Sequence, residues 1–230
     1  MSGLTEAPPR PAAQKARSPL EHELGPHYRS LIYRLRGGSS LPAGLRTIGI
    51  TSCSGGEGVT SVAMNLAVVA AEAQLGRVLL VDANVENPSL PRHFLQCRQK
   101  GVTDLLAGDA ECDACIWESP VENLFLLAAG SGAAAPVPRC DADVLGRIVD
   151  RLKESFGLTI FDLPPAHELS ACFPLASQLD GVLLVVEAER VRSAAALRAR
   201  QQLEDAQVPL LGVVFNKRRR YLPNWLYRLL

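Results

Sequence analysis

The amino-acid sequence predicts an α/β fold, an open and mostly parallel sheet with helices on both faces. Short apolar runs alternate with helical patterns along most of the chain. The run at residues 78–81 is apolar throughout, as expected for a parallel strand that is covered on both faces. Several runs end in a polar residue or a glycine-rich turn. Right-handed crossovers would bring these strand ends to one edge of the sheet, so we expect a ligand site there.

The individual elements follow from the periodicity of the apolar residues. Strands are expected at residues 46–51, 78–81, 124–128, 158–161, 182–186 and 211–215. Helical segments are expected at residues 27–35, 60–74, 101–108, 141–156 and 193–206. The segment at residues 60–74 is apolar nearly all round, so we expect it to be buried between the sheet and a second layer.

Length and composition are those of one domain with a tail at each end. The 230 residues are 47% hydrophobic, which is enough for a sizeable core. We expect a flexible leader with a short helix at residues 1–40, the domain at 41–216, and a basic, aromatic tail at 217–230. The net charge is zero, so no nucleic-acid partner is expected. The sequence has neither a run of about 18 apolar residues nor an apolar signal core, which predicts a cytoplasmic protein.

Residues 48–67 read I-G-I-T-S-C-S-G-G-E-G-V-T-S-V-A-M-N-L-A, the strand, glycine-rich turn and helix of a phosphate-binding loop. Glycines let successive backbone N–H groups point inward, and the helix N-terminus adds partial positive charge. Thr60 stands where a hydroxyl that holds Mg²⁺ is expected. The residues predicted to bind the nucleotide here are Gly55, Gly56, Glu57, Gly58, Val59, Thr60 and Ser61. The alternative is a strand-to-helix turn without a ligand.

Two positions depart from the pattern of this loop. Val59 occupies the position of the lysine that reaches the terminal phosphates, and Cys53 that of the first glycine. Losing one charge-assisted hydrogen bond costs on the order of 1.5–3 kcal/mol, roughly tenfold to a hundredfold in affinity. The loss in phosphate transfer should be larger, because the lysine also offsets charge in the transition state. Arg92, Arg98, Lys100 or an arginine of a neighbouring subunit are candidate substitutes.

Polar residues end three other predicted strands. Asp162 follows an apolar strand, the place of a carboxylate that holds Mg²⁺ through water, and Asp82 ends another strand in the same way. Both are predicted to join Thr60 at a Mg²⁺ site, and to be the catalytic residues if phosphate is transferred. Asn216 ends the last strand, where an amide can hydrogen-bond adenine. Each acid has the alternative of a strand-end cap, and an asparagine at a turn is common.

Six cysteines are scattered along the chain. In a cytoplasmic domain they are most simply small buried hydrophobic residues. The spacing of Cys112 and Cys115 also suits a redox pair or a metal site, with His93 and Cys97 as conceivable further ligands. No second closely spaced pair supports zinc. The cysteines are Cys53, Cys97, Cys112, Cys115, Cys140 and Cys172.

Six sequence blocks occur in a fixed order along the chain. They are Gly-Glu-Gly-Val-Thr-Ser (56–61), Leu-Leu-Val-Asp-Ala-Asn with Pro-Ser-Leu (79–90), Gly-Val-Thr-Asp-Leu-Leu-Ala-Gly (101–108), Phe-Asp-Leu-Pro-Pro (161–165), Asp-Gly-Val-Leu-Leu-Val-Val (180–186) and Gly-Val-Val-Phe-Asn-Lys-Arg (212–218). With them, residues 26–230 resemble the bacterial tyrosine kinases of capsule and exopolysaccharide synthesis. These are P-loop proteins related to the cell-division and plasmid-partitioning ATPases.

The resemblance implies ATP or ADP with Mg²⁺ as the cofactor in a P-loop NTPase-like domain at residues 41–216. It implies Asp162 as the Walker B carboxylate, Asp82 as the first acid of the second Walker motif, and Thr60 as a Mg²⁺ ligand. It also implies a membrane-embedded co-polymerase or export partner. A homo-oligomer is an open alternative.

The sequence departs from the family where phosphate is handled. Val59 replaces the loop lysine, and Asn84 replaces the second acid of the Asp-x-Asp motif. Of the Glu-x-x-Arg-x-x-Arg helix used in ring assembly, only the middle arginine remains, as Arg29. The tyrosine cluster at the end of family members is reduced to Tyr221 and Tyr227. These joint losses favour a degenerate kinase-like protein.

Three functions follow from the residues and the resemblance. The first is a barely catalytic kinase-like subunit of a polysaccharide system, peripheral at the inner membrane. The second is an active tyrosine autokinase in which another cation replaces the lysine. The third is a partitioning-type ATPase that dimerises with nucleotide. The tail at residues 217–230 has five cations, no acid and a Trp/Leu cluster, which suits an anionic membrane or a partner, or a last helix packed on its own domain.

Overall fold

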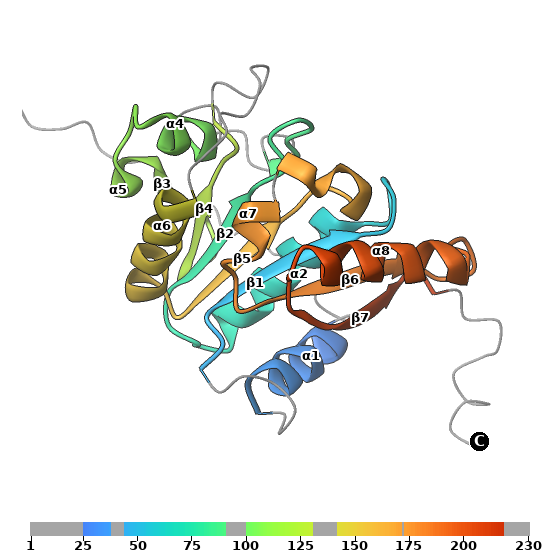
Figure 1. The fold of residues 1–230 in the computed structure, drawn as a ribbon. Coiled ribbons are helices and arrows are strands. Elements are labelled where there is room, and N and C mark those ends of the chain that lie inside the picture. Colours follow the sequence, from blue (N-terminus) through green and yellow to red (C-terminus); the bar gives the residue numbers. More distant parts are fainter. Residues whose placement is uncertain (1–24, 38–43, 91–99, 131–141, 172, 219–230) are drawn as a thin grey trace, which may run out of the picture.

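The computed structural model describes residues 25–37, 44–90, 100–130, 142–171 and 173–218, which contain a seven-stranded sheet (Figure 1). The strands are β1 (Thr47–Ser52), β2 (Val78–Asp82), β3 (Ile116–Glu118), β4 (Leu124–Leu127), β5 (Leu158–Asp162), β6 (Gly181–Glu187) and β7 (Leu210–Asn216). Their order in the sheet is β3-β4-β2-β5-β1-β6-β7. All neighbours pair in parallel except β3, which runs antiparallel to β4.

Helices cover both faces of this sheet, which confirms the predicted fold class. The helices are α1 (Gly25–Gly37), α2 (Val59–Glu72), α4 (Val102–Ala107), α5 (Cys112–Cys115), α6 (Ala142–Ser155), α7 (Phe173–Ala176) and α8 (Ser193–Asp205), with a 3-10 helix η1 (Ala166–Ala171). One apolar core lies under α1 and α2, and the other lies under α6, α7 and α8 on the opposite face. Strands with buried side chains on both faces, such as β2 and β5, separate the two cores.

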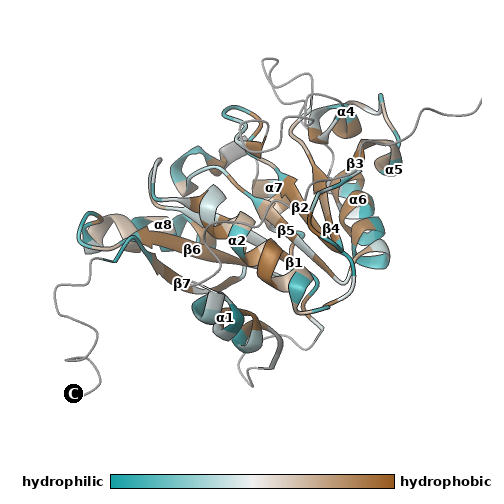
Figure 2. Cartoon of the chain, turned by 180° about the vertical axis from the view of Figure 1, so that it is seen from behind, coloured by the Kyte–Doolittle hydropathy of each residue, from teal (hydrophilic) through white to brown (hydrophobic). Residues whose placement is uncertain are grey.

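The predicted burial of the helix after β1 is confirmed. Its apolar side chains, including Val62, Leu66 and Val69, are buried on the sheet and on α1. Ile32 and Leu35 of α1 are buried in the same core, so α1 packs beside α2 and covers part of it. Figure 2 shows the contrast between a mostly hydrophobic α2 and a more hydrophilic α1.

The six predicted strands all occur, with ends that differ by one residue at most. The sequence pattern misses four short elements, β3, α5, η1 and α7, because three to six residues are too few to reveal a period. The predicted leader up to residue 24 and the tail from residue 219 lie outside the described residues. Among the residues that the structure describes, no helix is long and apolar enough to cross a membrane.

The parallel strands bring the predicted polar residues to one edge of the sheet. β1 pairs with β5 on one side and with β6 on the other, so the loop after β1 starts between them. Asp82 at the end of β2 is the register partner of Asp162 at the end of β5. Asn216 ends β7 beyond β6. The loop therefore has two flanks, one at the ends of β2 and β5 and one at the ends of β6 and β7.

Candidate phosphate-binding site

The loop at residues 53–58 has a backbone that depends on glycine. Gly56 and Gly58 have φ angles of 83° and 92°, in the left-handed region that side chains rarely adopt. A Cβ atom at Gly58 would also collide with Nδ2 of Asn216. Gly58 is the N-cap residue of α2, so the loop leads directly into the N-terminus of a 14-residue helix. Free amides and the partial positive charge of that N-terminus are typical of an anion-binding site.

Four side chains meet on the β2–β5 side of the loop. Thr60 Oγ1 donates to Asp162 Oδ2 at 2.7 Å, and Ser89 Oγ donates to the same oxygen at 3.0 Å. Asp82 Oδ2 accepts hydrogen bonds from the backbone amides of Ser89 at 2.8 Å and Leu90 at 2.9 Å. The structure thus brings together the three predicted Mg²⁺-site residues. We call this cluster, Thr60, Asp82, Ser89 and Asp162, the acid flank.

Both aspartates of the acid flank are buried, and no positive side chain of the described residues pairs with them. Asp82 is 0% exposed and Asp162 is 1% exposed. Burial raises the pKa of both, that of Asp162 to about 7, where the charge of Asp82 contributes. Hydrogen bonds from hydroxyls and backbone amides oppose the pKa shifts, whereas no cation of the described residues lowers either value. Within the described residues, the acid flank therefore holds negative charge that a cation would offset.

The donor set of the acid flank fits Mg²⁺. Asp82 Oδ1 is buried and has no hydrogen-bond partner in the described part of the chain. It adds to the oxygens of Thr60 and Asp162, and Mg²⁺ takes oxygen ligands from one or two carboxylates together with phosphates and water. No group of three or more His, Cys, Asp or Glu residues is placed to hold a metal within the described ranges. The residues present thus suit a Mg²⁺ ion that arrives with a polyphosphate.

The predicted substitutes for the loop lysine do not supply a cation to the acid flank in the described structure. Val59 lies half-buried in the first turn of α2, as a neutral side chain. Lys100 Nζ instead donates to the backbone oxygen of Asp109 at 2.7 Å. Arg92 and Arg98 lie outside the described residues.

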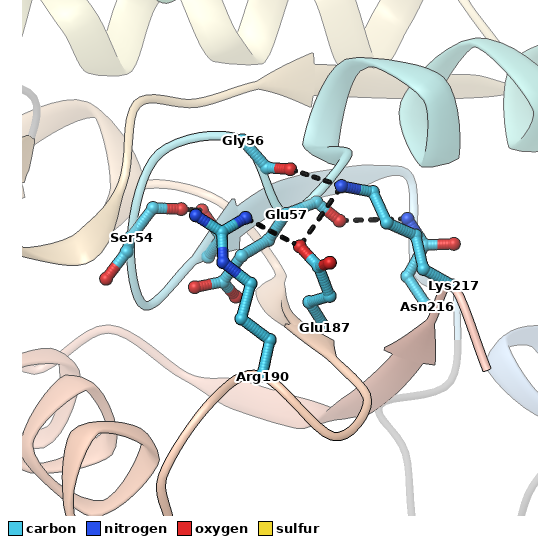
Figure 3. A network of polar contacts seen from close by, with 8 residues as sticks. Ser54, Gly56, Glu57, Glu187, Arg190, Asn216 and Lys217 are labelled. Atoms are coloured by element: carbon cyan, nitrogen blue, oxygen red, sulfur yellow. Dashed lines mark hydrogen bonds and ion pairs between the residues drawn. The ribbon is translucent and has the colours of Figure 1, made fainter. Parts of the chain in front are cut away.

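The opposite flank of the loop carries both signs of charge (Figure 3). Asn216 Nδ2 donates to the backbone oxygen of Glu57 at 2.9 Å. Lys217 Nζ donates to the backbone oxygen of Gly56 at 2.6 Å and lies 3.1 Å from Glu187 Oε2. Arg190 Nη1 pairs with that carboxylate oxygen at 2.9 Å. We call Glu187, Arg190, Asn216 and Lys217 the basic flank.

The remaining predicted loop residues differ in exposure. Gly55 and Ser61 are exposed, whereas Glu57 is only 2% exposed. No side chain of the described residues donates a hydrogen bond to either carboxylate oxygen of Glu57. Burial raises the pKa of Glu57 and the charge of Glu187 adds to the shift, although backbone amides such as that of Cys53 oppose it. The Glu57 side chain is thus a buried acid, and its backbone is the part available to a phosphate.

The structure favours a packing role for the described cysteines. Cys112 and Cys115 are free thiols in the core near α5, and burial raises the pKa of both. Cys53 is also buried, with a pKa raised to about 11. A raised pKa suppresses the thiolate that metal binding and redox chemistry require. His93, Cys97, Cys140 and Cys172 lie outside the described residues.

Sequence reasoning missed four residues of the two flanks, namely Ser89, Glu187, Arg190 and Lys217. Ser89 lies in the Pro-Ser-Leu block at residues 88–90, so its position in a family motif is the signal that points to it. Glu187 and Arg190 follow β6 in a segment without a recognisable motif. Their contacts with Lys217 and with each other, and the effect of Glu187 on the Glu57 carboxylate, connect them to the loop.

The fold and the site together define a P-loop protein of the α/β class. No family model matches the chain. Tyrosine-protein kinase CpsD of Streptococcus pneumoniae is 30% identical over 175 residues, which are 75% of this chain and 76% of CpsD. The chain therefore belongs to the family of bacterial tyrosine-protein kinases that includes CpsD.

Solved structures agree with this assignment. The VpsO kinase domain has a TM-score of 0.72 and 26% identity, covering 85% of this chain and 94% of that domain. The septum site-determining protein MinD of Pyrococcus horikoshii OT3, complexed with Mg-ADP, has a TM-score of 0.62 and 25% identity. The match covers 80% of this chain and 76% of MinD. The sequence resemblance to bacterial tyrosine kinases and to MinD-like ATPases is thereby confirmed.

Proposed function

We propose that the protein is a kinase-like subunit of a capsule or exopolysaccharide system that binds Mg²⁺-ATP or Mg²⁺-ADP and transfers phosphate weakly. The proposal depends on one observation, that the site keeps its Mg²⁺-binding side chains but lacks the loop lysine. Thr60, Asp82 and Asp162 converge beside the N-terminus of α2, whereas Val59 stands where the loop lysine is expected. Membership of the CpsD family supports the biochemical class, and the Mg-ADP in MinD supports the ligand.

Each part of the site has a separate task in this proposal. The loop amides and the N-terminus of α2 bind the phosphates. The Thr60 hydroxyl and the Asp162 carboxylate hold Mg²⁺, and Asp82 with its unpartnered Oδ1 faces the same region. When bound, Mg²⁺ neutralises phosphate charge and polarises the terminal phosphoryl group. Asp82 would accept the proton of an attacking hydroxyl if transfer occurs.

The charge balance of the site supports binding with slow transfer. Two buried acids without a described counter-cation accept Mg²⁺, but they repel a polyphosphate that arrives without it. Val59 gives the developing transition-state charge no compensation. The nucleotide would then act mainly as a structural or switching ligand.

The partner in this proposal is a membrane-embedded co-polymerase or export protein of the same system, and the protein is peripheral at the inner membrane. β7 supports an external contact, because Val213 is 48% and Phe215 is 70% exposed on this edge strand. The basic tail follows directly in the sequence. Co-purification of the full chain with the co-polymerase of its own operon tests this part, and its loss in Phe215→Ser is the expected result.

The central experiment combines titration calorimetry with a phosphotyrosine assay on the purified full chain. Mg²⁺-ADP and Mg²⁺-ATP should bind, EDTA should abolish binding, and Asp162→Ala should remove it. Phosphotyrosine should stay near background. Asp150→Asn, on the exposed face of α6, is the matched control and should bind like the wild type.

The intact acid flank favours an active autokinase as the second candidate. Robust phosphotyrosine that disappears in Asp82→Ala and Asp162→Ala would establish it instead of the weak enzyme. ATP-dependent dimers on a sizing column, without phosphotyrosine, would point to a partitioning-type ATPase. Absence of all nucleotide binding would reject the proposal.

A further inference from the structure

Two side chains at the end of β7 hold the phosphate loop from outside. Asn216 Nδ2 donates to the carbonyl of Glu57 at 2.9 Å, and Lys217 Nζ donates to the carbonyl of Gly56 at 2.6 Å (Figure 3). These are consecutive peptide groups of the loop. Both contacts join segments 159 and 161 residues apart in the sequence, so they are tertiary contacts rather than local turns.

These two contacts fix the direction of the loop amides. In a planar trans peptide the carbonyl and the N–H of the next residue point in opposite directions. Holding the carbonyls of Gly56 and Glu57 on the outside therefore turns the amides of Glu57 and Gly58 toward the inside. Neither amide donates to a backbone acceptor among the described residues. Inward, unsatisfied amides are the groups that bind a phosphate.

Glu187 fixes the position of Lys217. Its Oε2 lies 3.1 Å from Lys217 Nζ and 2.9 Å from Arg190 Nη1, and its side chain is only 16% exposed. Hydrogen bonds from Lys217 and Arg190 lower the pKa of Glu187, so it stays ionised at neutral pH. The side chains of Arg190 and Lys217 are 62% and 46% exposed, and ion pairs with such exposed partners stabilise a fold little. We therefore assign this cluster a positional effect. Lys217 Nζ is held between a fixed carboxylate and the loop carbonyl.

We propose that Asn216 and Lys217 are positioning residues that keep the loop in its phosphate-binding conformation, so that nucleotide affinity persists without the loop lysine. The ligand class is a nucleoside diphosphate or triphosphate, and this inference rests on the proposed function. In this role Lys217 acts on the loop through the Gly56 carbonyl, to which its Nζ donates. Glu187 anchors Lys217, and Gly58 leaves the space that Asn216 occupies.

The test removes the Lys217 contact and follows the loop with and without nucleotide. Lys217→Met loses the donor, and Lys217→Arg keeps one. Arg218→Met removes an adjacent exposed cation as the matched control. The first measurement is the ¹⁵N order parameter of the Glu57 and Gly58 amides in nucleotide-free protein. We expect it to fall in Lys217→Met from about 0.85 to below about 0.6 and to stay high in the other two variants.

The second measurement is the Kd for Mg²⁺-ADP by titration calorimetry. Lys217→Met should weaken binding about tenfold, the equivalent of ~1.4 kcal/mol, with recovery in Lys217→Arg. Unchanged order parameters in Lys217→Met would overturn the proposal whether or not nucleotide binds. Lower order parameters of the Glu57 and Gly58 amides together with an unchanged Kd would refute a role of Lys217 in nucleotide binding. If the wild type binds no nucleotide, the proposed function fails, and the order parameters alone decide whether Lys217 orders the loop.

Discussion

The two flanks of the phosphate loop treat charge in opposite ways. In the acid flank, Asp82 and Asp162 are buried together, and no described cation lowers their pKa values. In the basic flank, the Glu187 carboxylate is paired with two cations, and its pKa is lowered. Within the described residues, the charge of the acid flank is therefore uncompensated, whereas the charge of Glu187 in the basic flank is compensated.

This difference separates a place for a ligand from a support for the loop. Buried carboxylates with raised pKa values gain stability when a metal ion replaces the missing positive charge. A paired carboxylate such as Glu187 has little to gain from a ligand, but it can fix the side chains around it. The loss of the loop lysine at Val59 affects the two flanks unequally, because that lysine would serve the phosphates beside the acid flank.

The largest expected effect comes from removing the buried charge of Asp162. An unfolded aspartate titrates near 3.8, whereas folded Asp162 keeps its proton up to about pH 7. The folded protein thus binds more protons between these values, so its stability falls as the pH rises through this window. Asp162→Asn keeps an acceptor for Thr60 and Ser89 without the charge. Relative to the wild type, the free energy of unfolding of Asp162→Asn should rise by about 4 kcal/mol above pH ~8.

Urea unfolding of nucleotide-free protein from pH ~4 to ~9 measures this difference. Asp150→Asn should follow the wild-type curve, because Asp150 is exposed. If the wild type and Asp162→Asn had parallel stability curves over this range, the acid flank would not hold an uncompensated charge, and the contrast between the flanks would disappear.

Restoring the loop lysine tests whether the phosphates beside the acid flank lack a cation. Val59→Lys should raise the affinity for Mg²⁺-ADP about tenfold to a hundredfold, or ~1.5–3 kcal/mol, through a charge-assisted hydrogen bond to phosphate. Phosphotyrosine formation should rise by more, because the added charge also stabilises the transition state. Val59→Met, similar in length but neutral, is the control. Equal Kd values for the lysine and methionine variants would mean that another cation already serves the phosphates.

The fold was predictable from the sequence because its determinants are local. Continuous apolar runs such as β2 and β5 show that a strand is covered on both faces, and the apolar circumference of α2 shows that this helix is packed on more than one side. β3 was not predicted, because three residues are too few to show a period. Its place beside β4 depends on pairing between separate segments.

The acid flank was predictable because strand ends mark it. Asp82 and Asp162 end apolar strands, and parallel topology places them side by side. The basic flank could not be predicted from the sequence, because its contacts depend on side-chain directions at the ends of β6 and β7. Nothing in the sequence near Glu187 or Arg190 indicates that Lys217 bonds the loop at Gly56. Asn216 binding to adenine remains a prediction, and its Nδ2 donates to Glu57 in the described structure.

The smallest expected effect concerns Glu57, an uncompensated acid beside the basic flank. Burial raises the pKa of Glu57 and no cation of the described residues lowers it, so the folded state favours the protonated form. Stability should therefore decline as the pH rises above the value for an unfolded glutamate, about 4.3. Glu57→Gln removes this decline and should raise Tm at pH 8 by about 2–4 °C, for a gain of ~1 kcal/mol. The gain should vanish near pH 4, and exposed Glu122→Gln should show none at either pH. A lower Tm for Glu57→Gln at pH 8 would mean that the protein compensates the charge of Glu57. Uncompensated acids around the loop would then be confined to the acid flank.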